Sequence, residues 1–194
     1  MRAVSAKVGA SFGFLGILVF LVMYSIAMSS DNEYTFFENY LSDLGVGPGA
    51  WAFNSGLIIT GLLLALFSIF GLGSVMGRDR LARATIALLI LSGALLMGIG
   101  IFNEDFKPHH YIFSVSYFLT FLATLVVATA SLLRTRALGL SGVVVSAGAS
   151  VFGALLLPMG GNPESETMAV LAMVVWGMLM SSAVLLKEYG RRIP

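Results

Sequence analysis

The residues with the most chemical potential lie in residues 104–114, the stretch EDFKPHHYIFS. This stretch contains both histidines of the chain, and two acids precede them. His110 and Ser114 are four residues apart, so on a helix they share a face, whereas His109 is turned about 100° away. We expect His110 to face the protein interior, because Ser114 and Tyr117 continue a polar stripe with it. An imidazole beside a hydroxyl can serve as base to a serine nucleophile, although a serine one turn along the same helix is poorly placed to attack a bulky substrate.

Two other polar segments could contribute to the same site. One is NYLSDLG, which is followed by an asparagine inside the next apolar segment, and the other is GNPESET. The candidate ligand-binding residues are Asn39, Ser42, Asp43, Asn54, Asp105, His110, Ser114 and Glu166. Asp43, His110 and Glu166 could also hold a divalent metal such as zinc, because catalytic zinc takes three protein ligands and an open position. This set is rich in carboxylates for zinc.

Each of these residues also has an ordinary structural explanation. Loops at a membrane surface carry polar residues in any case. An acid such as Glu166 is favourable in the first turn of a helix, and adjacent histidines can simply lie at the membrane boundary. A shared site therefore requires that the three segments converge in space.

The composition places all three segments in a membrane protein. Hydrophobic residues make up 58% of the 194 residues, charged residues make up 11%, and the mean hydropathy is +0.93. Soluble domains carry about 25% charged residues. Backbone polar groups in lipid must pair within their own segment, so the spanning segments are helices. The sequence predicts an all-α bundle of six transmembrane helices in a single transmembrane domain, residues 1–194.

Six segments have the roughly 20 apolar residues that a spanning helix needs. We expect the helices at about residues 8–28, 50–72, 81–102, 109–133, 138–157 and 167–186. The first apolar run is longer than the 7–15 residues of a signal peptide, so we expect it to be a retained helix. A mid-helix tryptophan, Trp176, is expected to pack against another helix.

Charge asymmetry orients the bundle. Ten of the eleven Lys and Arg residues fall before helix one, in the loops 2–3 and 4–5, or after helix six, and Lys107 is the exception. Basic loops stay in the cytoplasm, which predicts cytoplasmic termini. Eight of the ten acids and both histidines then lie on the outer side. We expect an integral protein of the plasma membrane with its acidic and histidine cluster facing outward.

The first outer loop is expected to contain a short interfacial helix. In TFFENYLSDLG, Thr35 and Glu38 have the spacing of a capping box, and Gly45 is a natural stop. Asp43 would then occupy the last turn, at the negative end of the helix dipole, where a carboxylate is disfavoured. This predicts that Asp43 has a compensating partner, such as a proton, a cation or a neighbouring donor.

Several classes of function lose support from composition. There is no cysteine, which excludes disulfides, thiolate metal sites and cysteine nucleophiles. The net charge of +1 gives no case for nucleic-acid binding. The expected partners are membrane lipids or a small polar ligand, and the oligomeric state is open.

The patterns NYLSDLG, AFNSG and GIFNEDFKPHHYIFSVSYF, followed by an acid ten residues before a tryptophan, resemble the domain-of-unknown-function 998 family over nearly the whole chain. The family's recurring polar positions correspond to the eight candidates named above. The resemblance implies a small polytopic membrane protein and supplies no reaction. Two positions depart from the family's pattern, with Thr167 in place of a common arginine and Asn103 in place of a common proline.

Two more distant similarities bear on function. The chain is distantly similar to the DRAM and Sfk membrane proteins, which are not clear enzymes. A weaker likeness to alkaline ceramidases implies a zinc site of three histidines and an acid, but this chain has only two adjacent histidines, which point about 100° apart on a helix.

Three hypotheses of function follow. The favoured one is an outward-facing polar pocket that binds a lipid headgroup, a small polar ligand or a cation, since polar groups within a membrane mark sites by default. The first alternative is a membrane-embedded, metal-dependent or serine-dependent hydrolase acting on a lipid of the outer leaflet. The second alternative is a small transporter, although no internal repeat or broken midplane helix is evident.

Overall fold

The computed structural model describes residues 6–190, and these form helices and no strand. Six stretches of helix are long and apolar enough to cross a membrane, so the predicted all-α bundle of six transmembrane helices is confirmed. The helices are α1 (Ala6–Ser30), α2 (Ala50–Leu66) with its continuation through η2 (Phe67–Leu72) and α3 (Gly73–Val75), α4 (Arg80–Ile101), α5 (Lys107–Thr135), α6 (Gly139–Leu156) and α7 (Pro163–Gly190).

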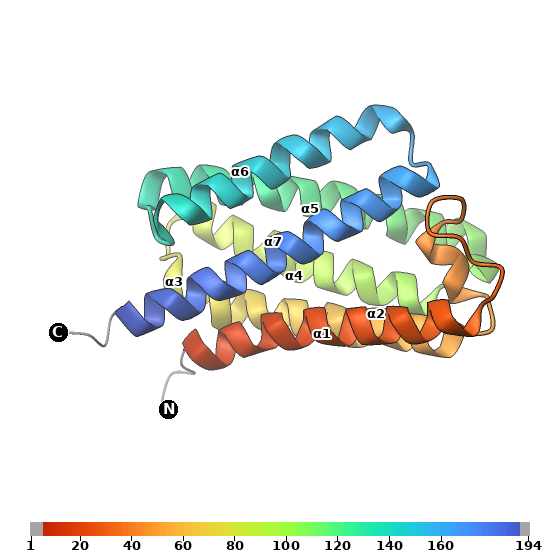
Figure 1. Ribbon diagram of the computed structural model, residues 1–194. Coiled ribbons are helices and arrows are strands. Elements are labelled where there is room, and N and C mark those ends of the chain that lie inside the picture. Colours follow the sequence, from red (N-terminus) through yellow and green to blue (C-terminus); the bar gives the residue numbers. More distant parts are fainter. Residues whose placement is uncertain (1–5, 191–194) are drawn as a thin grey trace.

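The six helices form a closed ring. Contacts join α1 to α2, α2 to α4, α4 to α5, α5 to α6 and α6 to α7, and α7 returns to contact α1 (Figure 1). The first and last described residues lie at one end of the bundle, which we call the terminal end. The first loop (residues 31–49) and the links α4–α5 and α6–α7 lie at the opposite end, which we call the site end. All three polar segments of the sequence therefore meet at one end.

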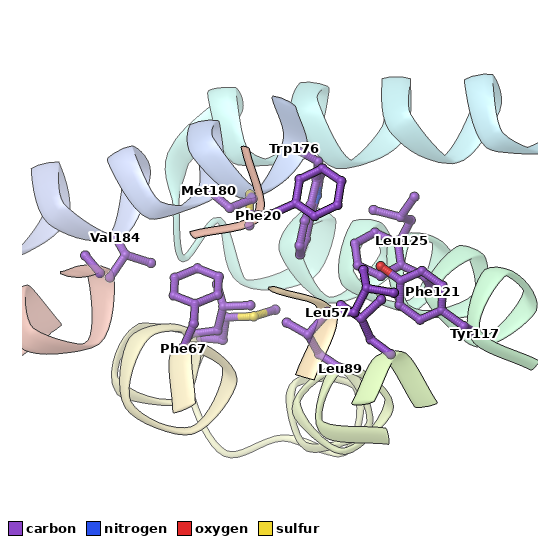
Figure 2. Close-up of a cluster of buried hydrophobic side chains, with 14 of the residues drawn as sticks. Phe20, Leu57, Phe67, Leu89, Tyr117, Phe121, Leu125, Trp176, Met180 and Val184 are labelled. Carbon is purple, nitrogen blue, oxygen red and sulfur yellow. The ribbon is translucent and has the colours of Figure 1, made fainter. Parts of the chain in front are cut away.

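A row of large buried side chains fills the centre of the ring (Figure 2). Trp176 of α7 is 1% exposed and meets Phe121 of α5 edge to face, with ring centroids 5.5 Å apart. Its indole N–H donates to Ser146 Oγ of α6 at 3.1 Å, so the one polar group of the indole has a hydrogen-bond partner. The tryptophan therefore joins three helices, as its position in the sequence suggested.

Glycines allow the helices to approach closely in the absence of a hydrophobic driving force between them. A Cβ atom on Gly61 of α2 would lie 2.4 Å from the carbonyl oxygen of Gly93 in α4. A Cβ atom on Gly9 of α1 would lie 2.3 Å from the backbone of Phe70 in η2. In these two places the helix backbones touch directly.

The terminal end is fixed by two polar side chains. Asp79 accepts hydrogen bonds from the N–H groups of Leu81 and Ala82 and so caps α4. Lys187 donates to the carbonyl oxygens of Val75, at 3.4 Å, and of Ala137. These contacts tie α7 to the end of α3 and to the α5–α6 link.

Candidate functional site

The first loop contains a shorter helix than the sequence predicted. Residues 36–39 form a turn, and the 3₁₀ helix η1 covers only Leu41–Gly45. The Thr35 N–H donates to Asn39 Oδ1, and the Tyr40 N–H donates to Asp43 Oδ2, each at 2.9 Å. Asn and Asp side chains compete with the backbone for such N–H groups, and here they divide the expected helix into a turn and a cap.

This division corrects two expectations. Thr35 and Glu38 do not form the predicted capping box, because the Thr35 N–H is bound by Asn39. Asp43 lies in the first turn of η1, at the favourable end of the helix dipole, and not in a last turn. Its carboxylate has compensating partners in the N–H of Tyr40 and the side chain of Asn39.

Side chains from three other parts of the chain hold η1 in place. Glu166 of α7 accepts the N–H of Leu41 at 2.9 Å, and Glu104 of η3 (Glu104–Phe106) accepts the hydroxyl of Ser42 at 2.6 Å. The carbonyl oxygen of Gly45 accepts from Asn54 Nδ2 at 2.8 Å and from Asn103 Nδ2 at 3.2 Å. The loop is therefore positioned by hydrogen bonds to α2, to the α4–α5 link and to α7.

The two histidines face different surroundings. His110 Nδ1 lies 2.9 Å from the carbonyl oxygen of Phe102, which can only accept, so the proton of a neutral imidazole is on Nδ1. The unprotonated Nε2 then lies 3.3 Å from Ser114 Oγ and 3.9 Å from Glu104 Oε1. His109 is exposed and stacks on Phe102, with ring centroids 5.4 Å apart. Only His110 is turned toward the polar cluster.

A cavity of about 610 Å³ begins at this cluster and continues between α5, α6 and α7. Its polar lining lies at the site end, and its apolar lining lies deeper in the bundle. The polar residues are Tyr40, Ser42, Glu104, Lys107, His110, Tyr111, Ser114, Ser165 and Glu166. The apolar residues further along the three helices include Phe118, Leu119, Leu122, Leu125, Ala149, Gly153, Ala169, Ala172 and Met173. The volume lies within the range of about 300–1,000 Å³ found for ligand pockets.

A second cavity of about 110 Å³ lies inside the ring and is almost entirely apolar. It shares Ser42, Ser114 and Glu166 with the larger cavity, so these three residues form part of the wall between the two spaces. Its volume is below the usual range of ligand pockets. The larger cavity is therefore the candidate binding site.

The electrostatics of the cluster are dominated by acids. Burial raises the pKa of Asp43 above its ordinary 3.8, and the nearby charge of Glu104 raises it further. Burial also raises the pKa of Tyr34, whose hydroxyl lies 3.5 Å from that of Tyr24. The shift of Asp43 favours the neutral form of a carboxyl that would otherwise add negative charge to the site end, and Tyr34 stays neutral.

The structure divides the eight sequence candidates into three groups. Ser42, His110, Ser114 and Glu166 line the larger cavity. Asn39, Asp43 and Asn54 bind the backbone of residues 35–45 and shape the loop that carries Ser42. Asp105 is exposed, does not line the cavity, and lies in η3 beside the acid that does.

Glu104 and Asn103 are two residues of the polar cluster that the sequence candidates omitted. Glu104 contacts Ser42 and His110, and Asn103 supports Gly45. The sequence pattern does not show which of the adjacent acids Glu104 and Asp105 faces the cavity, because a three-residue helix is too short for a hydrophobic period.

The metal hypothesis gains no geometric support. Within residues 6–190 there is no group of three or more His, Cys, Asp or Glu side chains that could hold a metal ion. The carboxylates of Asp43 and Glu166 instead accept backbone N–H groups of Tyr40 and Leu41.

The fold and the cluster together define a polytopic membrane protein of six helices with a polar-headed cavity at one end. The model of a family described as "Protein of unknown function (DUF998)" matches residues 14–186, and the chain belongs to this family. The resemblance seen in the sequence motifs is thereby confirmed. Comparison with curated proteins and comparison with solved structures each found no match.

Proposed function

We propose that the protein binds a membrane amphiphile, with the polar head at the site-end cluster and the hydrocarbon chain between α5, α6 and α7. The observation that carries this proposal is the division of one cavity into a polar end and an apolar end. Hydrogen-bonding side chains, Ser42, His110 and Ser114 among them, lie at its mouth, and leucines and alanines line its depth. Such a lining matches a molecule with one polar end and one hydrocarbon end.

The depth of the apolar part supports a lipid. On α5 the apolar lining runs from Val115 to Leu125, which is ten residue steps or about 15 Å of helix. Half of a bilayer core about 30 Å thick is also about 15 Å. A chain in the cavity would therefore end near the depth reached by the chains of the surrounding leaflet.

The edge of the cavity supports lateral entry from the bilayer. Leu119 of α5 is 51% exposed, and Leu157, in the short helix η4 (Leu157–Met159), is 56% exposed. Both residues line the cavity and also face outward from the bundle. With the basic residues concentrated at the terminal end, we place the head cluster on the outer side of the plasma membrane.

Thermal stabilisation of the reconstituted protein tests this proposal. The protein is placed in phosphatidylcholine nanodiscs, and dodecylamine, monolaurin and dodecyl phosphate are titrated separately. A ligand that binds only the folded state raises the melting temperature with its concentration. The variant Ala172→Phe fills the apolar part of the cavity from α7, so we expect at least one amphiphile to stabilise the wild type and not this variant.

Leu171→Phe is the matched control, because Leu171 is 46% exposed on the outer face of α7 and does not line the cavity. This control should respond to the amphiphiles as the wild type does. Equal shifts in the wild type and Ala172→Phe for all three amphiphiles would overturn the proposal, because they would reflect general partitioning into the disc.

A hydrolase is the second candidate function, and one observation favours it. Ser114 Oγ lies 3.3 Å from His110 Nε2, and the bond from Nδ1 to the Phe102 carbonyl keeps Nε2 available as a base. A fluorophosphonate carrying a dodecyl chain should label Ser114 if this pair is nucleophilic. Failure to label the wild type above the level of Ser114→Ala would remove this candidate. A flux measurement in liposomes tests the small-transporter alternative.

A further inference from the structure

The charged groups around the head of the cavity are mainly acids. Glu104 comes from η3 and Glu166 comes from α7, and the adjacent residues Ser42 and Leu41 donate to Glu104 and Glu166 respectively. Lys107 is the one basic residue of this lining, and it is exposed at the first residue of α5. The arginines of the described chain lie at the opposite end of the bundle, in the α3–α4 and α5–α6 regions.

The two carboxylates retain hydrogen-bonding capacity. Glu104 Oε1 accepts the Ser42 hydroxyl, and Glu166 Oε2 accepts the Leu41 N–H. Within residues 6–190 the second oxygen of each carboxylate receives no hydrogen bond. His110 Nε2 is already paired with the Ser114 hydroxyl at 3.3 Å, so the free acceptors are the second oxygens of the two carboxylates. A molecule that satisfies these acceptors must bring donors.

We propose that the amphiphile bound by this protein carries a cationic amine head, recognised by Glu104 and Glu166; this inference rests on the proposed function. An ammonium group offers three N–H donors and a positive charge, which complements two carboxylates. A phosphate or carboxylate head would place acceptors and negative charge against the same groups, which like-charge repulsion opposes. A bare metal ion lacks the three-ligand group that would hold it within the described residues.

Comparison of head groups on one chain tests the inference. Dodecylamine, monolaurin and dodecyl phosphate share a similar chain and differ in head charge. The binding is measured in nanodiscs, and the signal of the Ala172→Phe variant is subtracted as background. Dodecylamine should bind at least about tenfold more tightly than dodecyl phosphate, and the affinity of monolaurin should lie between them. Ethanolamine has the amine without the chain, and it should give no stabilisation at the same concentrations.

Two substitutions at adjacent positions distinguish a specific contribution of the lining carboxylate from a general effect of negative charge on amine binding. Glu104→Gln removes a carboxylate of the lining and should weaken dodecylamine binding at least about tenfold. Asp105→Asn removes the same charge from the next, exposed residue and should leave that binding unchanged. Retained monolaurin binding by Glu104→Gln shows that the variant folds. Dodecylamine binding by Glu166→Gln tests the other carboxylate in the same way.

The possible failures are distinguishable. Equal binding of the three amphiphiles, or preference for dodecyl phosphate, would overturn the amine inference and leave the amphiphile proposal standing. Equal losses in Glu104→Gln and Asp105→Asn would assign the preference to bulk charge and overturn the role of Glu104. Binding of ethanolamine at the site would show a soluble amine as the ligand, and absence of all binding would overturn both proposals.

Discussion

The carboxylate of Glu166 accepts the backbone N–H of Leu41 at 2.9 Å, across 125 positions of sequence. This bond joins the first turn of α7 to the start of η1, next to Ser42 in the cavity lining. Leu41 is 5% exposed, so its N–H has little access to water. The same bond thus explains why a hydrogen-bond acceptor lies at position 166 and contributes to the defined shape of the loop.

Removing the acceptor at position 166 should destabilise the protein. Glu166→Ala leaves the Leu41 N–H buried without a partner, and we expect a loss of about 1–3 kcal/mol in the free energy of unfolding. Glu166→Gln keeps an acceptor oxygen and should lose clearly less. Unfolding by SDS in mixed micelles measures both variants, and equal losses would show that the bond to Leu41 does not stabilise the fold.

The bond between Ser42 and Glu104 should appear as an energetic coupling. Ser42→Ala, Glu104→Ala and the double variant form a thermodynamic cycle, in which each single variant removes the hydrogen bond. We expect a coupling of about 1–3 kcal/mol in the free energy of unfolding, because the hydroxyl donates to a charged acceptor at 2.6 Å. A second cycle pairs Ser42→Ala with a substitution of the exposed Asp105, and the effects of these two variants should be additive. Coupling in both cycles would contradict the assignment of the bond to Glu104.

Asp43 should make stability depend on pH. Its folded-state pKa is raised above 3.8, so the folded protein holds the proton more tightly than the unfolded chain. This contribution is complete below 3.8 and is lost as the pH rises through the folded-state pKa. Asp43→Asn keeps an acceptor for Tyr40 without the charge. The melting temperature of this variant should therefore rise relative to the wild type as the pH is raised from 3.8 through the folded-state pKa of Asp43.

The opposite trend in Asp43→Asn would have a clear meaning. If the variant loses stability relative to the wild type as the pH rises, the ionised carboxylate is the stabilising form. The N–H of Tyr40 would then outweigh burial and the charge of Glu104 in setting the pKa of Asp43.

The packing of α1 against η2 should not tolerate a methyl group. Gly9→Ala places a Cβ atom 2.3 Å from the Phe70 backbone, and overpacking of this kind costs about 1–3 kcal/mol. Gly148→Ala in α6 meets no atom within 4 Å and should be neutral or slightly stabilising. Melting temperatures of the two variants make the comparison, and a neutral Gly9→Ala would show that α1 can move away from η2.

Single cysteines test the proposed orientation, and the chain has no native cysteine to interfere. Glu38→Cys lies at the site end and Arg78→Cys at the terminal end, and both positions are exposed. An impermeant maleimide added to intact cells should label position 38, whereas position 78 should react only after permeabilisation. The reverse pattern would place the head cluster in the cytoplasm and overturn the outer-leaflet proposal.

The sequence by itself determined the number and approximate positions of the helices. Each apolar run was long enough to cross a bilayer, and backbone hydrogen bonding in lipid leaves helix as the choice for such runs. It also identified which polar segments would gather at one end, because an odd number of crossings separates residues 31–49, 102–106 and 157–162 from the terminal end. Four of its eight site candidates line the cavity for this reason.

Only the tertiary structure decided which polar groups share the site. The contacts of Leu41 with Glu166 and of Ser42 with Glu104 join residues that no local period relates. Glu104 and Asp105 are chemically alike, and the path of the chain through η3 alone turns one toward the cavity. Asn39, Asp43 and Asn54 shape the first loop because its backbone N–H and carbonyl groups required partners once it folded over the bundle.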